Sequence, residues 1–596
     1  MKAMVFGKAI NKYYAKYWYL FFLGILGLIV VDYAQLMIPE IMGDLVDAIK
    51  LDPNSVLTWA GLKKPVLTIL LIGVAIFFGR FLWRLTLLRA GFLIEADIRK
   101  DMFLHAEKMS VRYYQEQKVG AMMALFTNDL ETIQTVVSDG TIFLIDALFL
   151  GILSLIKMMI SNWSLGLIAT IPLLLLAACG GIIGRAMSKK YKERQEAYEQ
   201  LSDFAQENFT GLSVIKAFVK EAHELREFSR INRYNKKVNV EFVRYGVLLD
   251  ILIDVLVYSI IVIILALGGY YVYQDQFSAG DVTEFVGYFN TIVWPMLALA
   301  QIINLRSRGK TSLARITSLL DEKEEIYTLC PVDKKTIDGN IRLEHFSFSF
   351  PGAQEPTLKD LSFSIHQGET IGIVGKIGCG KSTLVQLLLH FYQIEEKHFF
   401  IDDVDFMRIP ISTLRENIGY VPQETFLFSG TIKENIAFAK EDASQNEIQD
   451  AARFADVDQN IQSFPLGYES LTGERGVSLS GGQKQRISIA RAIIRDPAIL
   501  ILDDAVSAVD VKTEETILEN IQKERKGKTT LIVASRVSTV RHADRILVLH
   551  KGEMEAFAPH EELMRVSPTY RRMVELQELE KEMEGYEWKT HMHKNG

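Results

Sequence analysis

Eight consecutive residues carry the clearest chemical signal in the chain. Gly375–Ser382 reads Gly-Lys-Ile-Gly-Cys-Gly-Lys-Ser and fits the phosphate-binding pattern G-x-x-x-x-G-K-[ST] without a mismatch. Backbone N–H groups of such a loop surround phosphate oxygens, and the helix that follows favours negative charge. Lys381 is expected to reach the terminal phosphates and Ser382 to ligate Mg²⁺. The residues predicted to bind a nucleotide here are Gly375, Gly378, Cys379, Gly380, Lys381, Ser382 and Thr383.

Two further segments add groups that suit phosphate chemistry. An apolar run, Ile499–Leu502, leads into Asp503 and Asp504, and Asp503 is placed to hold Mg²⁺ directly or through water. Ser480, Gly481, Gly482 and Gln483 open a predicted helix, whose uncrowded N–H groups suit an anion. ATP and Mg²⁺ are therefore the expected ligands.

The elements around these residues predict an α/β domain. Residues 370–374 form an apolar strand that runs into the phosphate loop, and Thr383 lies in the first turn of a predicted helix. Strands and helices alternate from 340 to about 575. Residues 306–339 read as a charged linker, and 576–596 as a charged C-terminal tail.

The part before residue 305 predicts a membrane domain. Its six apolar stretches are each long enough to cross a bilayer, at 18–39, 66–88, 139–160, 163–185, 245–273 and 282–305. Basic residues flank their inner ends, which predicts that both termini and the ATP-binding region are cytoplasmic. About 50 and 60 polar, helix-patterned residues follow the second and fourth stretches, long enough for helical hairpins projecting more than ~30 Å. We expect a six-helix membrane domain over 1–305, in the plasma or inner membrane.

Composition excludes several classes of protein. The net charge of −7 gives no basic footprint for nucleic acid. Three scattered cysteines are too few for a disulfide framework or a zinc site. The hydrophobic fraction of 49% is high for a soluble protein and agrees with membrane spans.

The motifs together resemble the ABC transporter family, in particular a type I exporter half-transporter of the multidrug type. The resemblance implies that Gln423 senses the metal and γ-phosphate, and that Phe350 takes the place of a Tyr that stacks on adenine. A core aromatic is the alternative for Phe350. It also implies that Ser480–Gln483 complete the ATP site of the opposing subunit, that Asp510 lies at the dimer interface, and that the two long connections couple the domains.

Two positions depart from the family pattern. Asp504 stands where a Glu polarises the attacking water, and Ser535 stands where a His contacts the γ-phosphate. Both changes fall in one site while every binding element is kept, which predicts a site that binds ATP but hydrolyses it slowly. The resemblance then implies a second, different half-transporter as partner. A homodimer with slow symmetric hydrolysis, exporting lipid or peptide, and a nucleotide-gated regulatory subunit are the alternatives.

Acidic residues in or near the apolar stretches are the candidates for contact with a transported compound. They are Asp32, Asp146, Asp250 and Asp254. Intramembrane carboxylates are costly and usually face a cavity or a partner. Asp250 and Asp254, with Trp294 and Gln301, are predicted to line a cavity for a small lipophilic cation. The alternative is that both carboxylates lie near the cytoplasmic end of their apolar stretch, where they are solvated and structural, or that they pair with Arg80 or Arg84.

Overall fold

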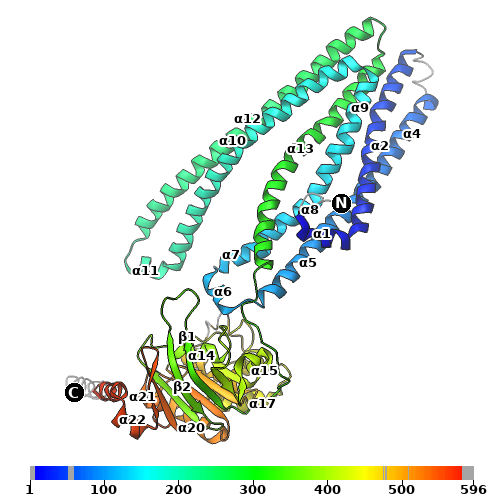
Figure 1. The fold of residues 1–596 in the computed structure, drawn as a ribbon. Coiled ribbons are helices and arrows are strands. Elements are labelled where there is room, and N and C mark those ends of the chain that lie inside the picture. The colour runs from blue at the N-terminus through cyan, green and yellow to red at the C-terminus, as the bar shows by residue number, and fades with distance from the viewer. Residues whose placement is uncertain are drawn as a thin grey trace. The chain divides into compact units, whose positions relative to one another are not determined.

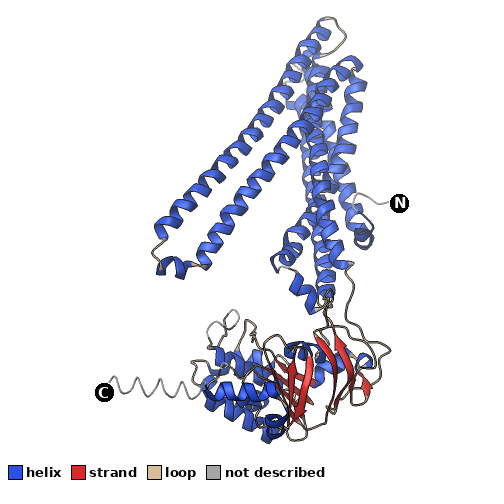
Figure 2. Ribbon diagram, turned by 60° about the vertical axis from the view of Figure 1, so that its left-hand side comes forward, coloured by secondary structure: helices blue, strands red, loops and turns tan. Residues whose placement is uncertain are grey.

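The computed structural model describes residues 7–51, 59–117, 119–473, 476, 479–507 and 509–579. The chain forms two compact units, and each is considered by itself (Figure 1). One comprises Met1–Glu107 and Lys118–Glu322, and the other Lys108–Gln117 and Lys323–Gly596. Every described strand belongs to the second unit (Figure 2).

All of the regular secondary structure described in the first unit is helical. In chain order its helices are α1 (Gly7–Lys16), α2 (Trp18–Leu51), α4 (Trp59–Trp83), α5 (Arg89–Ala106), α7 (Val119–Ala124), α8 (Leu130–Ile145), α9 (Gly151–Ser161), α10 (Trp163–Thr210), α11 (Leu212–Ala217), α12 (Glu221–Tyr273) and α13 (Ala279–Leu320). Three π-helical turns interrupt them: η1 (Arg84–Leu88), η2 (Leu125–Asp129) and η3 (Asp146–Leu150).

Five of the six predicted apolar stretches lie in helical segments that are long and apolar enough to span a membrane. These segments are Trp18–Ile49, Leu62–Ala106, Val119–Ser161, Glu221–Tyr273 and Ala279–Leu320. The remaining stretch, 163–185, lies in α10, where the side chains of residues 172–186 are outside the described part. The predicted fold class, a helical membrane domain joined to an α/β domain, is confirmed.

Both long polar connections are helical, as predicted. α10 and α12 pack side by side, with the short α11 joining their far ends (Figure 1). α13 also continues as a helix beyond its apolar part to Leu320, so the segment predicted as a linker from residue 306 begins as helix. The reason is amphipathic spacing, because Ser312, Ile316 and Leu319 are buried on one face.

α2 and α13 approach closely where small residues meet. A Cβ on Gly280 would lie 2.3 Å from the carbonyl oxygen of Gly43, so only glycine allows this approach. Asp47 of α2 accepts hydrogen bonds from the Gly280 N–H (2.8 Å) and the Ser278 hydroxyl (2.5 Å). Ser278 in turn caps α13 by accepting from the Asp281 N–H. This end of the α2–α13 contact is therefore fixed by hydrogen bonds as well as packing.

The second unit contains two sheets. A four-stranded antiparallel sheet has the order β2-β1-β4-β5, and a six-stranded sheet has the order β10-β9-β3-β8-β7-β6. The strands are β1 (Ile341–Phe348), β2 (Leu358–Ile365), β3 (Thr370–Gly375), β4 (Phe399–Ile401), β5 (Val404–Asp405), β6 (Ile418–Val421), β7 (Ile499–Asp503), β8 (Thr529–Val533), β9 (Arg545–His550) and β10 (Glu553–Ala558).

The helices of this unit cover the sheets and build a separate helical part. They are α6 (Val111–Glu116), α14 (Lys381–Leu388), α15 (Ile411–Asn417), α16 (Ile432–Ala437), α17 (Gln445–Phe454), α18 (Asp458–Gln462), α19 (Gly481–Ile493), α20 (Val511–Glu524), α21 (Val537–Val540), α22 (His560–Val566) and a last helical stretch over 568–579.

The strand order determines where chemistry can gather. β3, β8, β7 and β6 are neighbours and run parallel, so their carboxyl ends meet at one edge of the sheet. Ligands of open parallel sheets bind at that edge. The strands themselves are buried, which holds the edge rigid.

Candidate functional site

The phosphate loop follows β3 and ends where α14 begins, as the sequence predicts. Gly378 and Gly380 have φ of 81° and 101°, a region that side chains rarely adopt. A Cβ on Gly380 would also lie 2.6 Å from Cδ2 of Leu358. The Lys381 ammonium donates to the Gly375 carbonyl oxygen at 2.8 Å, which holds it against the loop. The loop has the shape and the cation that a phosphate chain requires.

An acidic residue and a hydroxyl lie beside this loop. Asp503 is the last residue of β7 and is 5% exposed, and the Ser382 hydroxyl hydrogen-bonds its carboxylate. Burial raises the pKa of Asp503, and the neighbouring Asp504 carboxylate raises it further. A bound cation would offset both effects. Two oxygen ligands beside a phosphate loop fit Mg²⁺, which keeps several waters and nucleotide oxygens in its shell.

Asp504 follows directly, with its backbone held from both sides. Its φ is 51°, its N–H donates to the Val533 carbonyl oxygen of β8 at 2.9 Å, and its carbonyl oxygen accepts from the Ser507 hydroxyl at 2.8 Å. The side chain is half-buried at the sheet edge. Because the backbone is fixed, the reach of this carboxylate is set by side-chain length alone.

Ser535 lies two residues beyond β8 at the same edge and is exposed. A residue that the sequence analysis missed holds its segment. The Gln577 side-chain amide donates to the Ser535 carbonyl oxygen (3.1 Å) and accepts from the Val537 N–H (2.8 Å). An open cavity of about 1150 Å³ adjoins this segment, with Glu514, His560 and Gln577 among its lining residues. Gln577 carries no local sequence signal, because its partners are about 40 residues away in the chain.

Two more predicted residues lie near the strand ends. Gln423 is exposed, two residues after β6. Phe350 is half-buried and meets Phe348 and Tyr392 edge-to-face, at centroid distances of 5.2 and 5.1 Å. This packing leaves part of the Phe350 ring accessible, so stacking on a base and a structural role both remain compatible with it.

Tyr392 also connects the aromatic group to an early segment of the chain. Its hydroxyl donates to the side-chain oxygen of Gln115, in α6, at 3.3 Å. The same segment pairs with residues 324 and 325 through Lys108–Glu324 (3.0 Å) and Arg112–Glu325 (3.3 Å). The tip of the first long connection therefore packs within the nucleotide-binding unit, next to a neighbour of Phe350.

Ser480–Gln483 start α19, in the helical part of the unit. Ser480 and Gln483 form a reciprocal cap: the Ser480 hydroxyl accepts from the Gln483 N–H (3.3 Å), and the Gln483 side chain accepts from the Ser480 N–H (3.0 Å). Asp510 caps α20 by accepting from the Thr513 N–H at 3.1 Å. That bond lowers the pKa of Asp510 below its ordinary value. Both predicted segments form ordered, N–H-rich helix starts.

The four residues predicted to line a membrane cavity lie on two helices, α12 and α13. Asp250 and Asp254 are exposed on α12, and Gln301 is exposed on α13. Trp294 instead donates from Nε1 to Oδ2 of Asp146 at 2.8 Å. The roles of these residues toward a transported compound stay predictions.

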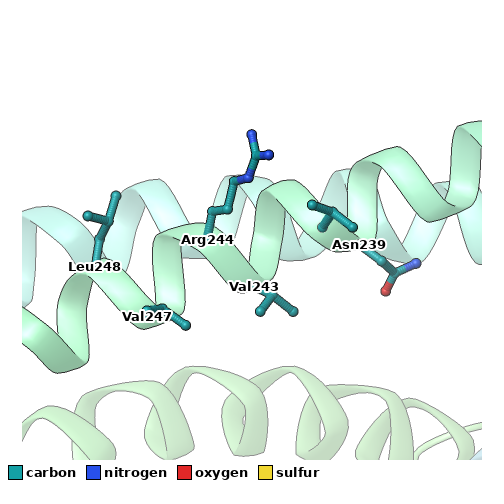
Figure 3. Close-up of a pocket in the computed structure, with 6 residues that line it drawn as sticks. Asn239, Val243, Arg244, Val247 and Leu248 are labelled. Carbon is teal, nitrogen blue, oxygen red and sulfur yellow. The ribbon is translucent and has the colours of Figure 1, made fainter.

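An apolar groove of about 600 Å³ runs along α12 before Asp250. Its lining residues are Asn239, Val240, Val243, Arg244, Val247 and Leu248. Val243 and Val247 point to one side of the helix and Arg244 to the other (Figure 3). Neither Asp250 nor Asp254 lines this groove.

The fold and the nucleotide edge together define an ABC transporter, with a membrane domain and an ATPase domain in one chain. Residues 21–296 match the family described as the ABC transporter transmembrane region, and residues 358–507 match the ABC transporter family. The chain belongs to the ABC transporter family and is a multi-pass membrane transport ATPase.

Known relatives cover almost the whole chain. It is 34% identical to the probable multidrug resistance ABC transporter ATP-binding/permease protein YheI of Bacillus subtilis, over 96% of this chain and 97% of that protein. It is 32% identical to the multidrug resistance-like ATP-binding protein MdlA of Escherichia coli, over 95% and 96%. In fold it resembles a bacterial Atm1-family ABC exporter with ATP bound, with a TM-score of 0.78, 24% identity, and coverage of 96% and 99%.

Proposed function

We propose that this chain is one half of a heterodimeric exporter, which uses ATP to move a small amphipathic or lipophilic compound out across the cell membrane. The names of the relatives support multidrug-type export. The ATPase unit is then cytoplasmic, where ATP is available. The partner is a second ABC half-transporter.

One observation carries the asymmetry of the proposal. At the edge formed by β3, β8 and β7 the binding groups are complete, whereas the two positions for hydrolysis hold Asp504 and Ser535. Asp is one methylene shorter than Glu, and the fixed backbone of Asp504 does not compensate. Ser535 has neither the reach nor the imidazole of His. The site therefore binds ATP tightly and turns it over slowly.

The residues of this edge take distinct parts in binding ATP. The loop N–H groups and Lys381 hold the phosphates, and Phe350 stacks on the adenine. Ser382 and Asp503 hold Mg²⁺, with Gln423 beside them. Mg²⁺, when bound, neutralises phosphate charge. Asp504 orients a water molecule from a position that is too far back for efficient proton removal.

The intact helix start at Ser480–Gln483 supports a second, working site. Its N–H groups suit the phosphates of a nucleotide held by another chain. A chain that hydrolyses slowly but keeps this segment and Asp510 is useful only beside a partner that turns over. The partner is therefore expected to carry Glu and His at the positions that match Asp504 and Ser535.

ATPase measurements test the proposal. The purified chain alone should be almost inactive, and the chain co-purified with any ABC half-transporter that is encoded next to it should be active. In that pair, changing the partner's catalytic Glu should abolish activity, and Asp504→Ala should only reduce it. Robust activity of the chain alone, lost in Asp504→Ala, would instead show a homodimer in which Asp504 is a working base. Compound leak without turnover would show a nucleotide-gated subunit.

A further inference from the structure

Three residues from distant parts of the chain meet inside the membrane unit. Asp32 lies in α2, Asp146 begins the π-helical turn η3, and Trp294 lies in α13. α2, η3 and α13 all pack against one another. Asp32 is 2% exposed and Asp146 is 6% exposed. A π-helical turn inside a membrane-spanning helix is itself typical of functional sites.

The two carboxylates are poorly satisfied. The Trp294 indole N–H donates a hydrogen bond to Oδ2 of Asp146 at 2.8 Å. Oδ1 of Asp146 and Oδ2 of Asp32 are buried and have no hydrogen-bond partner among the described residues. The carboxylates lie close enough to interact electrostatically, and Arg80 of α4 is the charged side chain that acts on both. Two acids therefore share the influence of one cation, and Arg80 forms no ion pair with either of them within the described part of the chain.

Two aromatic rings lie beside Asp146. Trp294 keeps 49% of its surface exposed. Phe143 meets it edge-to-face at 6.1 Å. An aromatic face backed by negative charge attracts an organic cation, because the ring quadrupole and the carboxylates act in the same direction. A metal ion fits less well, since the described residues hold no cluster of three or more metal-binding side chains.

We propose that Asp32, Asp146 and Trp294 form the recognition site for the cationic group of the transported compound. The compound class is a monovalent aromatic or lipophilic cation. Its rings lie against Trp294 and Phe143, and its charge is held by the field of the two carboxylates behind them. This inference rests on the proposed export function and assigns recognition to this junction instead of to Asp250 and Asp254.

Equilibrium binding to the assembled, nucleotide-free transporter in nanodiscs tests the assignment. The probe is tetraphenylphosphonium, and the neutral comparison compound is triphenylphosphine oxide. Asp146→Asn keeps an acceptor for the Trp294 indole but removes the charge. It should weaken cation binding at least tenfold and change binding of the neutral compound less than twofold. Asp32→Asn should act in the same direction.

A control variant and a folding check accompany these measurements. Asp139→Asn alters a half-buried carboxylate on the neighbouring α8 and should change neither affinity. MgATP binding by each variant in the same nanodiscs reports that the protein is folded. Trp294→Phe, which keeps an aromatic ring, should lose less cation affinity than Trp294→Ala.

Several results would overturn the inference. Equal losses for the cation and the neutral compound would mean that Asp146 is only structural. Unchanged cation binding in both Asp→Asn variants, or a loss confined to Asp250→Asn, would place recognition elsewhere. None of these binding results changes what the ATPase measurements on the assembled pair show. Failure of the proposed function shows itself separately, as a pair without ATP-dependent transport.

Discussion

Lengthening the side chain at position 504 should restore hydrolysis at this chain's own ATP site. The backbone there is held by the 2.9 Å bond from the Asp504 N–H to Val533 and by the Ser507 hydroxyl on its carbonyl oxygen. Asp504→Glu therefore extends the carboxylate toward the nucleotide by about 1 Å without moving the chain. An error of about 1 Å in a reacting group costs up to about 10²-fold in rate.

The size of the expected gain follows from that geometry. Asp504→Glu alone should raise phosphate release at this site by about 10–10²-fold. Asp504→Glu combined with Ser535→His should bring the gain to about 10²–10⁴-fold, the usual contribution of a placed general base. In free energy this is about 3–5 kcal/mol of barrier. Affinity for ATP should stay unchanged, because no residue of the phosphate loop is altered.

The assay is single-turnover ATP hydrolysis by the assembled pair, with the partner's catalytic Glu changed to Gln so that only this site reports. Asp504→Asn, matched in size to Asp504, serves as the control and should not gain activity. The reasoning is refuted if Asp504→Glu leaves the rate unchanged or lowers it while Asp504→Asn abolishes it. That pattern would mean that Asp already reaches the water.

Three further outcomes are expected. Gly380→Ala should lower ATP affinity at least tenfold in nucleotide-binding assays, because its φ of 101° and the Leu358 side chain at 2.6 Å leave no room for a Cβ. Gln577→Ala should destabilise the ATPase unit by about 0.5–1.5 kcal/mol in thermal melts, because two partly exposed backbone groups of the Ser535 segment lose their partner. Gln577→Glu, which keeps one acceptor, should cost less. Burial lowers the pKa of His390 to about 4, below its value of about 6.5 in the unfolded chain. The folded state therefore keeps the full stabilisation from neutral His390 above about pH 6.5 and loses it as the pH falls toward 4. His390→Phe should flatten the decline in melting temperature between pH 7 and pH 5.

The nucleotide edge was predictable because its signals are local. The loop Gly375–Ser382 and the acidic pair Asp503–Asp504 each follow a buried strand. Parallel strands bring their carboxyl ends to one edge, so strand and motif order already imply that these groups converge. The strand ends confirm this placement. The roles assigned to individual residues remain predictions.

The membrane contacts were not predictable in the same way. Apolar periodicity shows that a helix spans, but it does not show which faces meet. Trp294 binds Asp146 across 148 residues, and Asp146 begins a π-helical turn that shifts the helical register. The sequence placed Trp294 with Asp250 and Asp254 because all three lie in neighbouring apolar stretches. The exposure of Asp250 and Asp254 on α12 depends on how the helices pack, and sequence spacing alone does not determine that packing.

The place of the 108–117 segment has a consequence for how the protein is made. Tyr392 and Gln115 are 277 residues apart in sequence, yet both belong to the nucleotide-binding unit. At a synthesis rate of about 5–20 residues per second, Gln115 leaves the ribosome some 14–55 s before its partner does. Residues 323–596 cannot complete this unit by themselves, because the unit also contains residues 108–117. That early segment is made first and waits while most of the membrane helices are synthesised. Assembly of the ATPase unit therefore joins a segment made before most of the membrane helices to one made after all of them.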